Sequence, residues 1–280
     1  MQIRQMTQED VNAAVELTSR ENWLSENYDV FQAFLFHDPK GCFIAEKNQE
    51  PVGICIATPY THSGFIGELI VSEEHRRQGI GSRLLVSAID YLKSRGISSI
   101  YLDAVPEAVP LYERLGFHRV CRSLRFHGRL EGQENEQVRA MRKWDLDRVC
   151  ALDRYTFGDD RHFFLKWISF IGPDFAKVFT KNKTIIGYIT GRYIKNGVSV
   201  GPWIIPPDIN PEKLLLSLAI ETLDEILHLG VLESNEKSIR LLQSLGLQEK
   251  DHFSIRMAWG KETTLGTSHN CFAIGSPAKG

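Results

Sequence analysis

The sequence predicts an α/β (α+β) protein of two tandem domains, each a mixed sheet covered by helices on both faces. Three observations lead to this fold class. The chain has 280 residues, more than one typical domain. Its first half shows strand and helix patterns in the order β-α-α-β-β-β-α-β-α-β. Several segments of the second half then repeat segments of the first.

Each expected element of the first half has a local reason. Residues 7–10 form a capping-box-like helix start, and the polar stretch 47–50 predicts a hairpin between two apolar runs. Asp38–Pro39 and Gly116 each mark a helix end. The expected strands are 3–6, 41–45, 51–57, 65–71 and 97–103, with a closing hairpin of 117–121 and 123–127. The expected helices have their apolar residues within 11–17, 28–37, 82–94 and 107–115.

Composition and charge exclude several classes of protein. The chain is 42% hydrophobic and 24% charged, as globular proteins are, and its net charge of −2 indicates neither a nucleic-acid nor an anionic-membrane partner. No apolar run has the length of a membrane helix, and the first residues do not resemble a signal peptide. The five scattered cysteines favour a reducing, cytoplasmic compartment. The nine histidines contain no His-Glu-x-x-His, so no metal is predicted.

Residues 71–85 are the most informative stretch. A strand ends there, a short loop with arginines and glycines follows, and a helix begins. Gly79 and Gly81 let a backbone approach a ligand closely, and the first N–H groups of the helix attract an anion. The loop is neither a P-loop nor a dinucleotide fingerprint. It therefore suits a phosphate-bearing cofactor, although a glycine-rich turn that merely caps a helix is the simpler alternative.

Arg76-Arg77-Gln78-Gly79-Ile80-Gly81 fits Arg/Gln-x-x-Gly-x-Gly/Ala and resembles the acyl-CoA pyrophosphate loop of the GNAT superfamily of N-acyltransferases. The strand order and the segment Leu111-Tyr112-Glu113-Arg114-Leu115-Gly116-Phe117 are similar to that family as well. The resemblance implies acetyl-CoA as acyl donor. It implies that the donor is bound by Leu69, Ile70, Val71, Arg76, Arg77, Gln78, Gly79, Ile80, Gly81 and Ser82.

Aminolysis of a thioester needs a proton donor for the sulfur and a base for the amine. The resemblance puts Tyr112 beside the sulfur, where its hydroxyl can donate. Glu68 is the first candidate base, with a solvated or ion-paired strand glutamate as the equal alternative. Asp103 is a second candidate and His75 a third. Glu73 and Glu74 are expected to be surface carboxylates of the loop.

The second half repeats the fold pattern without the loop. Gly67 and Gly201 are 134 residues apart, whereas Gly116 and Gly246 are 130 apart, so four residues are missing between them. The loss falls where the phosphate loop should be, and Pro206–Pro211 replaces it. Leu242 stands at the position of Tyr112. Asn235 stands where the first half has Val105, a position at which many family members carry Asn.

These patterns predict a catalytic domain at 1–127, a linker at 128–137 and a degenerate domain at 138–280. The whole resembles the tandem family that includes the YitH-like acetyltransferases. We expect acetyl transfer to a primary amine by direct attack in a ternary complex, with one acetyl-CoA per chain, and either a monomer (a pseudo-dimer of the two halves) or a homodimer. A non-catalytic acyl-CoA sensor and a structural scaffold are the alternatives.

The second half is expected to close the acceptor pocket with residues near Trp203 or at Asp159–Arg161. For Asp159, Asp160 and Arg161, the more favoured reading is structural: an acidic pair at a helix start beside a packing arginine.

Overall fold

The computed structural model describes residues 1–23, 25–260 and 265–280. Their packing divides the chain into two units. The first holds residues 1–119, the β13 residues from Met257 onward and Lys279. The second holds residues 120–256 and most of the C-terminal segment. The sequence halves and the packed units therefore do not coincide.

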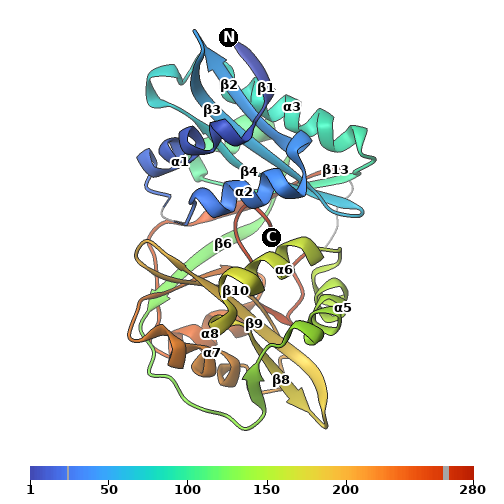
Figure 1. Cartoon of the computed structure of the whole chain (residues 1–280), viewed down its shortest axis with the longest axis vertical. Coiled ribbons are helices and arrows are strands. Elements are labelled where there is room, and N and C mark those ends of the chain that lie inside the picture. Colours follow the sequence, from blue (N-terminus) through green and yellow to red (C-terminus); the bar gives the residue numbers. More distant parts are fainter. Residues whose placement is uncertain (24, 261–264) are drawn as a thin grey trace. The chain divides into compact units, whose positions relative to one another are not determined.

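The first unit contains most of the elements that the sequence predicts (Figure 1). Its strands are β1 (Gln2–Gln5), β2 (Cys42–Lys47), β3 (Glu50–Pro59), β4 (Ser63–Val71) and β5 (Ser99–Ala104), and its helices are α1 (Val11–Arg20), α2 (Tyr28–His37), α3 (Ile80–Ser94) and the short α4 (Val109–Glu113). Single 3-10 turns lie at Gln8–Asp10, Pro39–Gly41, Glu73–His75 and Pro106–Ala108.

The first sheet is mixed, as predicted. Its strand order is β1-β2-β3-β4-β5-β13, antiparallel from β1 to β4 and parallel between β4 and β5. Helices α1 and α2 lie on one face and α3 on the other (Figure 1). Gly53 and Gly64 allow α3 to come close, because a Cβ at either position would lie within 3.2 Å of Leu84 or Leu92. This close packing holds α3, and therefore the loop that leads into it, against the sheet.

The second unit repeats this arrangement. Its strands are β6 (His118–Gly128), β7 (Val138–Ala140), β8 (Lys177–Lys181), β9 (Thr184–Ile194), β10 (Gly197–Ile204), β11 (Leu227–Leu232), β12 (Gln248–Glu249) and β14 (Cys271–Ala273), and its helices are α5 (Leu146–Phe157), α6 (His162–Ile171), α7 (Glu212–Ala219) and α8 (Glu236–Ser244). Strand β13 spans Ser254–Gly260, and single 3-10 turns lie at Lys143–Asp145, Pro173–Phe175 and Ile220–Thr222.

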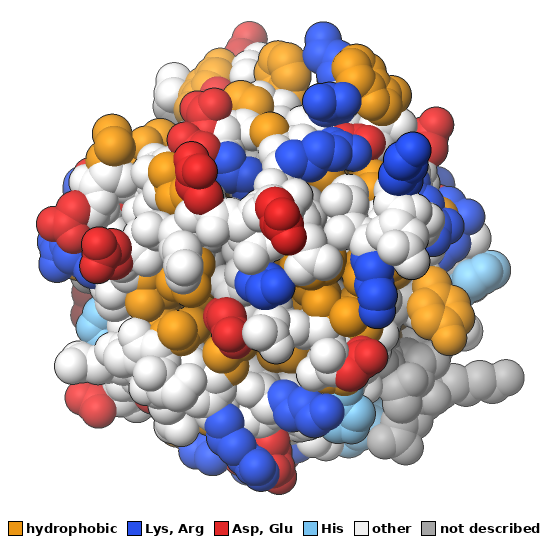
Figure 2. All heavy atoms as spheres, turned by 90° about the horizontal axis from the view of Figure 1, so that it is seen from below, with side chains coloured by type: hydrophobic (Ala, Val, Ile, Leu, Met, Phe, Trp, Pro, Cys, Tyr) orange, Lys and Arg blue, Asp and Glu red, His pale blue; other side chains and the backbone are white. Residues whose placement is uncertain are grey.

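The second sheet has the order β6-β11-β10-β9-β8-β7, and apolar side chains fill both of its faces. On one face, Leu214 and Leu242 of α7 and α8 pack with Trp203 and Phe126. On the other face, Val149 and Leu165 of α5 and α6 form a separate cluster. Over the surface drawn in Figure 2, described side chains of both charge signs are interspersed with apolar ones, which fits the small net charge.

An ion pair that the sequence analysis missed supports the repeat. Arg4 Nη2 donates to Asp10 Oδ1 at 2.8 Å, and Arg139 Nη2 donates to Asp145 Oδ1 at 2.9 Å. In each unit the carboxylate also accepts a backbone N–H three residues before it and so fixes the start of the following helix. The signal was present as an Arg six residues before an Asp in both halves.

The predicted hairpin of 117–121 and 123–127 is wrong. These residues form one continuous strand, β6, which pairs with β11 of the second unit from Ser123–Leu232 to Gly128–Leu227. Only Arg122 separates the two expected strands, and no turn residue interrupts them. Leu124 and Phe126 are buried in the core of the second unit, so hydrophobic burial there outweighs a local hairpin. Residues 129–137 contain no helix or strand.

Candidate functional site

A bulge in β4 shapes the centre of the first unit. Ile70 faces Ile54 and Gly67 faces Ile56, so Glu68 and Leu69 together lie opposite Cys55. Glu68 adopts φ +51°, a conformation that is uncommon outside glycine, and is only 4% exposed. Such backbone strain is retained where the surrounding structure holds it and is frequent at functional sites.

Beyond the bulge, β4 has a partner on one side only. Its parallel pairing with β5 covers Ser63–Ser99 to Phe65–Tyr101 and goes no further. Among the described strands, only β3 accompanies the rest of β4. Leu69, Ile70 and Val71 thus present a strand edge on the β5 side. Backbone groups at such an edge are available to a ligand that can pair with a strand.

The loop between β4 and α3 carries the features of an anion site. Gly79 has φ +78° and forms the N-cap of α3, and no side chain in the described structure caps that helix start. A Cβ at Gly79 would meet nothing within 4 Å, and one at Gly81 would meet only Val71 and Leu111 at ordinary contact distance. The first N–H groups of this 15-residue helix thus have no side-chain cap, and the two glycines leave space beside the helix start.

The basic side chains of the loop are exposed, and one of them is already engaged. Arg76 Nε donates to the Val71 carbonyl at 3.0 Å, and its guanidinium pairs with Glu21. Gln78 accepts from Lys47 Nζ at 3.1 Å. Arg77 has φ +63° and, like Arg76, is exposed. Gly79 is exposed as well, whereas Ile80 is buried and Gly81 and Ser82 are half-buried.

Tyr112 lies on α4 and is only 7% exposed, with its ring edge-on to Phe117 at 5.9 Å. Burial, and then the nearby Cys55 thiol, raise the pKa of Tyr112. Burial also raises the pKa of Cys55, and the Glu68 carboxylate raises it further. Cys55 is therefore a common neighbour of the predicted acid, Tyr112, and the predicted base, Glu68. No sequence motif singled out Cys55, because it lies inside an ordinary apolar strand.

The other candidate bases lie on other segments of the first unit. Asp103 is half-buried near the end of β5. His75 Nδ1 lies 3.0 Å from the Ser72 hydroxyl. Glu73 and Glu74 are exposed, as predicted. Within the described residues, no group of three or more His, Cys, Asp or Glu side chains could hold a metal ion. No helix among them is long and apolar enough to cross a membrane.

In the second unit, the chain itself fills the equivalent of the β4 edge. Strand β14 pairs with β10, Trp203 facing Ala273 and Ile204 facing Cys271. The N–H of Ile205 donates to the Asn270 carbonyl at 3.0 Å. Ile204 and Ile205 correspond to Ile70 and Val71 of the first unit. The backbone that is open in the first unit is therefore occupied in the second.

Side chains of α8 hold this C-terminal segment in place. Asn235 Nδ2 donates to the Cys271 carbonyl at 2.8 Å, while its oxygen caps α8 by accepting from the Ser238 N–H. Ser238 Oγ donates to the Phe272 carbonyl at 2.6 Å. In the first unit the position of Asn235 is Val105, which is 46% exposed. The family's Asn thus has a structural task in the second unit, which sequence comparison alone did not indicate.

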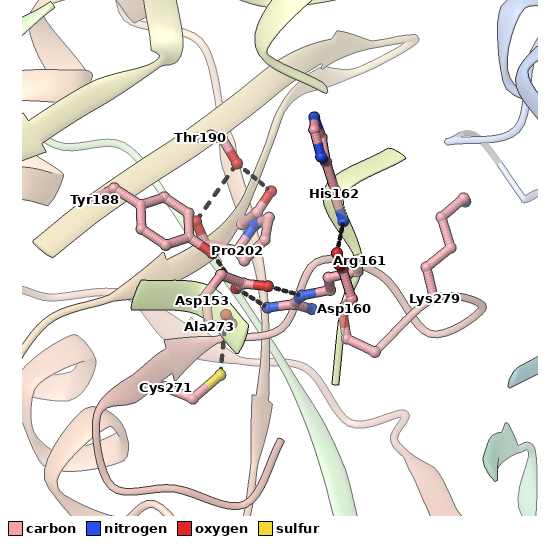
Figure 3. Close-up of polar contacts among 12 residues, drawn as sticks. Asp153, Asp160, Arg161, His162, Tyr188, Thr190, Pro202, Cys271, Ala273 and Lys279 are labelled. Atoms are coloured by element: carbon pink, nitrogen blue, oxygen red, sulfur yellow. Dashed lines mark hydrogen bonds and ion pairs between the residues drawn. The ribbon is translucent and has the colours of Figure 1, made fainter. Parts of the chain in front are cut away.

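Asp159, Asp160 and Arg161 fit the structural reading rather than a substrate-facing one. Arg161 is 1% exposed, and its Nε and Nη2 donate to Asp153 at 2.9 and 2.8 Å, while Nη1 donates to the Gly280 carbonyl at 2.6 Å. The Tyr188 hydroxyl donates to the same carboxylate, and Figure 3 shows these side chains converging on Asp153. Asp160 accepts from the His162 N–H at the start of α6.

The expectation that residues near Trp203 close an acceptor pocket stays a prediction, but Trp203 itself has no exposed surface. Its side chain is fully buried and lies 5.1 Å, centroid to centroid, from Phe272. Strand β10 has helices on both faces, so alternate side chains enter one core or the other. Trp203 enters the core under α7 and α8 and contributes to stability there.

Replacing Arg161 by Met should destabilise the protein by about 3–5 kcal/mol, because the Asp153 carboxylate would remain buried without its cation. Urea unfolding measures the loss. Arg154→Ala is the matched control: Arg154 pairs with Asp160 at the surface, where it is 59% exposed, and its loss should cost less than about 1 kcal/mol. A smaller loss for Arg161→Met than for Arg154→Ala would contradict a structural role.

Comparison with known protein families agrees with this geometry. Residues 6–117 match the model of the acetyltransferase (GNAT) family, and residues 149–273 match an acetyltransferase (GNAT) domain. N-alpha-acetyltransferase 30 of Dictyostelium discoideum is 34% identical over 116 residues, which are 38% of this chain and 63% of that protein. The uncharacterised N-acetyltransferase YitH of Bacillus subtilis is 26% identical over 161 residues, 55% of each protein. The chain thus spans less than two thirds of the length of either relative.

A solved structure matches the whole fold. A crystal structure from Pyrococcus horikoshii superposes with a TM-score of 0.85 over 100% of this chain and 95% of that chain, at 23% identity. At this identity the match concerns the fold alone. It shows that both units, and not only the first, belong to one known architecture.

Proposed function

Because the chain belongs to the GNAT acetyltransferase family and carries two of its domains in tandem, we propose that it transfers the acetyl group of acetyl-CoA to a primary amine. The first unit carries the activity. The amine attacks the thioester directly while both substrates are bound. The name of the relative from Dictyostelium discoideum favours an α-amine, such as the free N-terminus of a peptide, as the acceptor.

The observation that carries this proposal is the combination of an open strand edge and an uncapped helix start in one unit. Leu69, Ile70 and Val71 offer backbone groups to an extended ligand arm, and the N-terminus of α3 offers N–H groups to its phosphates. The open space at Gly79 and Gly81 fits the close approach of a phosphate. Arg77 is exposed beside it and adds positive charge. The residues present therefore fit acyl-CoA.

Tyr112 holds a proton throughout the neutral range. Its burial raises the pKa of the hydroxyl, so the phenol stays neutral and able to donate. An ordinary thiol is more acidic than an ordinary phenol, and burial widens that difference here. Tyr112 therefore assists the departure of the thiolate chiefly by donating a hydrogen bond that strengthens as charge develops on the sulfur.

Glu68 is the proposed base for the amine. Its carboxylate sits on the β4 bulge, and its charge raises the pKa of Cys55, which in turn neighbours Tyr112. A base on the same strand as the open edge can take a proton from an amine that attacks there, either directly or through a water molecule. Because the cysteines are scattered and free, we propose a reducing compartment, the cytoplasm.

The alternative of a non-catalytic acyl-CoA sensor shares the loop and the strand edge but has no need of Tyr112. The test is an assay of acetyl-CoA consumption with short peptides whose N-terminus is free, each paired with the same peptide blocked at its N-terminus. Turnover with free α-amines alone supports the proposed acceptor. Turnover only with lysine side chains would replace the α-amine by an ε-amine. Binding without turnover on any amine would favour the sensor.

Gly79→Ala should weaken acetyl-CoA binding at least about tenfold, since a side chain there both strains the φ +78° backbone and fills the approach to the helix start. Gly96→Ala is the matched control, because Gly96 follows the other end of α3 with φ +79° and equally open surroundings. Calorimetry should give one site per chain in the control and wild type. Equal affinities in both variants, or two sites per chain, would refute the assignment.

A further inference from the structure

A group of basic side chains lies on one face of the second sheet, away from the loop described above. Phe126 of β6 and Leu229 of β11 are buried in the core under α7 and α8. Because successive side chains of a strand point to opposite faces, the neighbouring His127 and His228 point to the other face. Both are half-buried, so they remain accessible from solvent.

The strand register brings these groups together. His127 and His228 are directly opposite each other in the antiparallel β6–β11 pair, where Cβ atoms are typically about 5 Å apart. Lys250 follows β12, and its Nζ lies 3.4 Å from Nδ1 of His228. The Lys250 N–H also donates to the carbonyl of Arg125, at 2.8 Å. Basic side chains from three neighbouring segments therefore share one small area.

Besides the contact between Lys250 and His228, the histidines hydrogen-bond to backbone carbonyls. Nε2 of His228 lies 3.1 Å from the Asn196 carbonyl, and Nδ1 of His127 lies 3.2 Å from the Gln248 carbonyl. Burial lowers the pKa of His228, and the charges of Lys250 and His127 lower it further, against the Asn196 carbonyl, which raises it.

The pKa values of two neighbouring basic groups, Lys250 and His252, are lowered as well. Burial and then Arg125 lower the pKa of Lys250. Burial, Lys250 and Arg125 lower the pKa of His252, where Asp251 is the opposing acidic neighbour. Like charges at this spacing destabilise a strand pair. Protonation of His228 or His252 is therefore opposed by the neighbouring cations, and a bound anion would offset that repulsion.

We propose that His127, His228 and Lys250 form a binding site for a small oxyanion, either free phosphate or the phosphate group of an ester. Lysine donates charge-assisted hydrogen bonds to such oxygens, and each imidazole adds a donor when it is protonated. The Arg125 guanidinium adds positive charge nearby, but it already donates to the Ser123 and Leu124 carbonyls. The site belongs to the second unit and does not depend on the acyl-CoA function proposed for the first.

The proposal fixes the direction of the pH dependence. A bound anion favours the imidazolium form of His228 and so raises the pKa that the free cluster lowers. By linkage, anion affinity should rise as pH falls through the histidine range, while the free protein loses stability there. Sulfate keeps its charge over this range, so a pH effect on its binding belongs to the protein.

The experiment is a titration of the full-length protein with sulfate and with inorganic phosphate at about pH 6 and about pH 8, following the ring signals of the histidines by NMR. The His127 and His228 signals should shift with both anions, and the anion affinity should be higher at the lower pH. Lys250→Gln should weaken binding about tenfold, because one charged donor is lost. Lys237→Ala, an exposed lysine of α8, is the matched control and should bind as wild type.

A stability measurement separates binding from a packing role. In buffer without multivalent anions, Lys250→Gln should raise the unfolding temperature, because repulsion is removed, and sulfate should stabilise it less than wild type. Lower stability of Lys250→Gln together with unchanged sulfate affinity would overturn the proposal. The absence of any shift of the histidine signals with either anion would also overturn the proposal. Adding coenzyme A to Gly79→Ala distinguishes the two ligands, since that variant binds coenzyme A weakly at the loop but keeps the histidine cluster intact. Histidine shifts with coenzyme A would indicate a phosphate ester, and shifts with inorganic phosphate alone would indicate free phosphate.

Discussion

Tyr112→Phe should lower turnover about ten- to a thousand-fold while acetyl-CoA affinity changes far less. The substitution removes one hydroxyl and leaves the ring, whose edge-on contact with Phe117 maintains the packing. A hydrogen bond that forms chiefly as charge develops on the sulfur acts on the transition state more than on the bound substrate. Steady-state kinetics with acetyl-CoA and a reactive amine, together with calorimetric affinity, measure both quantities.

Tyr112→Leu is the informative companion, because Leu242 occupies the equivalent position in the second unit. If the hydroxyl is what matters, the Leu and Phe variants should lose turnover to a similar extent. Since burial raises the pKa of Tyr112, ionisation of this residue should not limit the wild-type rate below about pH 10. Wild-type turnover in Tyr112→Phe would mean that the thiolate is stabilised elsewhere.

A chain shortened to residues 1–127 should fail to fold cooperatively. In the first unit, β13 is the strand beyond β5, and it comes from the C-terminal part of the chain. Its backbone approaches closely, since a Cβ at Gly260 would lie 2.1 Å from the Ser98 carbonyl. Trp259 packs at Gly116 and under Lys93, whose Nζ lies 4.3 Å from the ring. Without β13, one edge of β5 and apolar surface become exposed.

Adding the missing strand back provides the control. Residues 1–119 joined by a flexible Gly/Ser linker of about ten residues to Ser254–Gly260 should regain a cooperative thermal transition and acetyl-CoA binding. Residues 120–127 of β6 are omitted because Leu124 and Phe126 belong to the core of the second unit. Cooperative unfolding and full affinity of the 1–127 chain would show that β13 is dispensable.

The local pattern of the sequence was sufficient for most elements, and it also predicted a candidate site. Hydrophobic period and turn residues predicted helix 28–37 at the bounds of α2, and strand 65–71 and helix 82–94 within two residues of β4 and α3. The Arg-x-x-Gly-x-Gly loop and Tyr112 could be singled out because each belongs to a short motif that resembles a known family, and their roles stay predictions. The loss of the loop in the second half was readable for the same reason.

Only the tertiary structure decided which strands pair and what fills each sheet edge. The β4 bulge arises because β4 has one residue more than the facing part of β3, and no residue type in the sequence predicts it. The sequence predicted a hairpin where β6 lies and no strand where β13 lies. Each of these strands belongs mainly to the unit of the other sequence half, because the packing of Leu124, Phe126 and Trp259 depends on partners more than a hundred residues away. Strand β14 occupies the second unit's edge because Asn235 and Ser238 bind its carbonyl groups. Backbone pairing over such separations is set by which apolar faces can be buried together, and a local pattern does not contain that information.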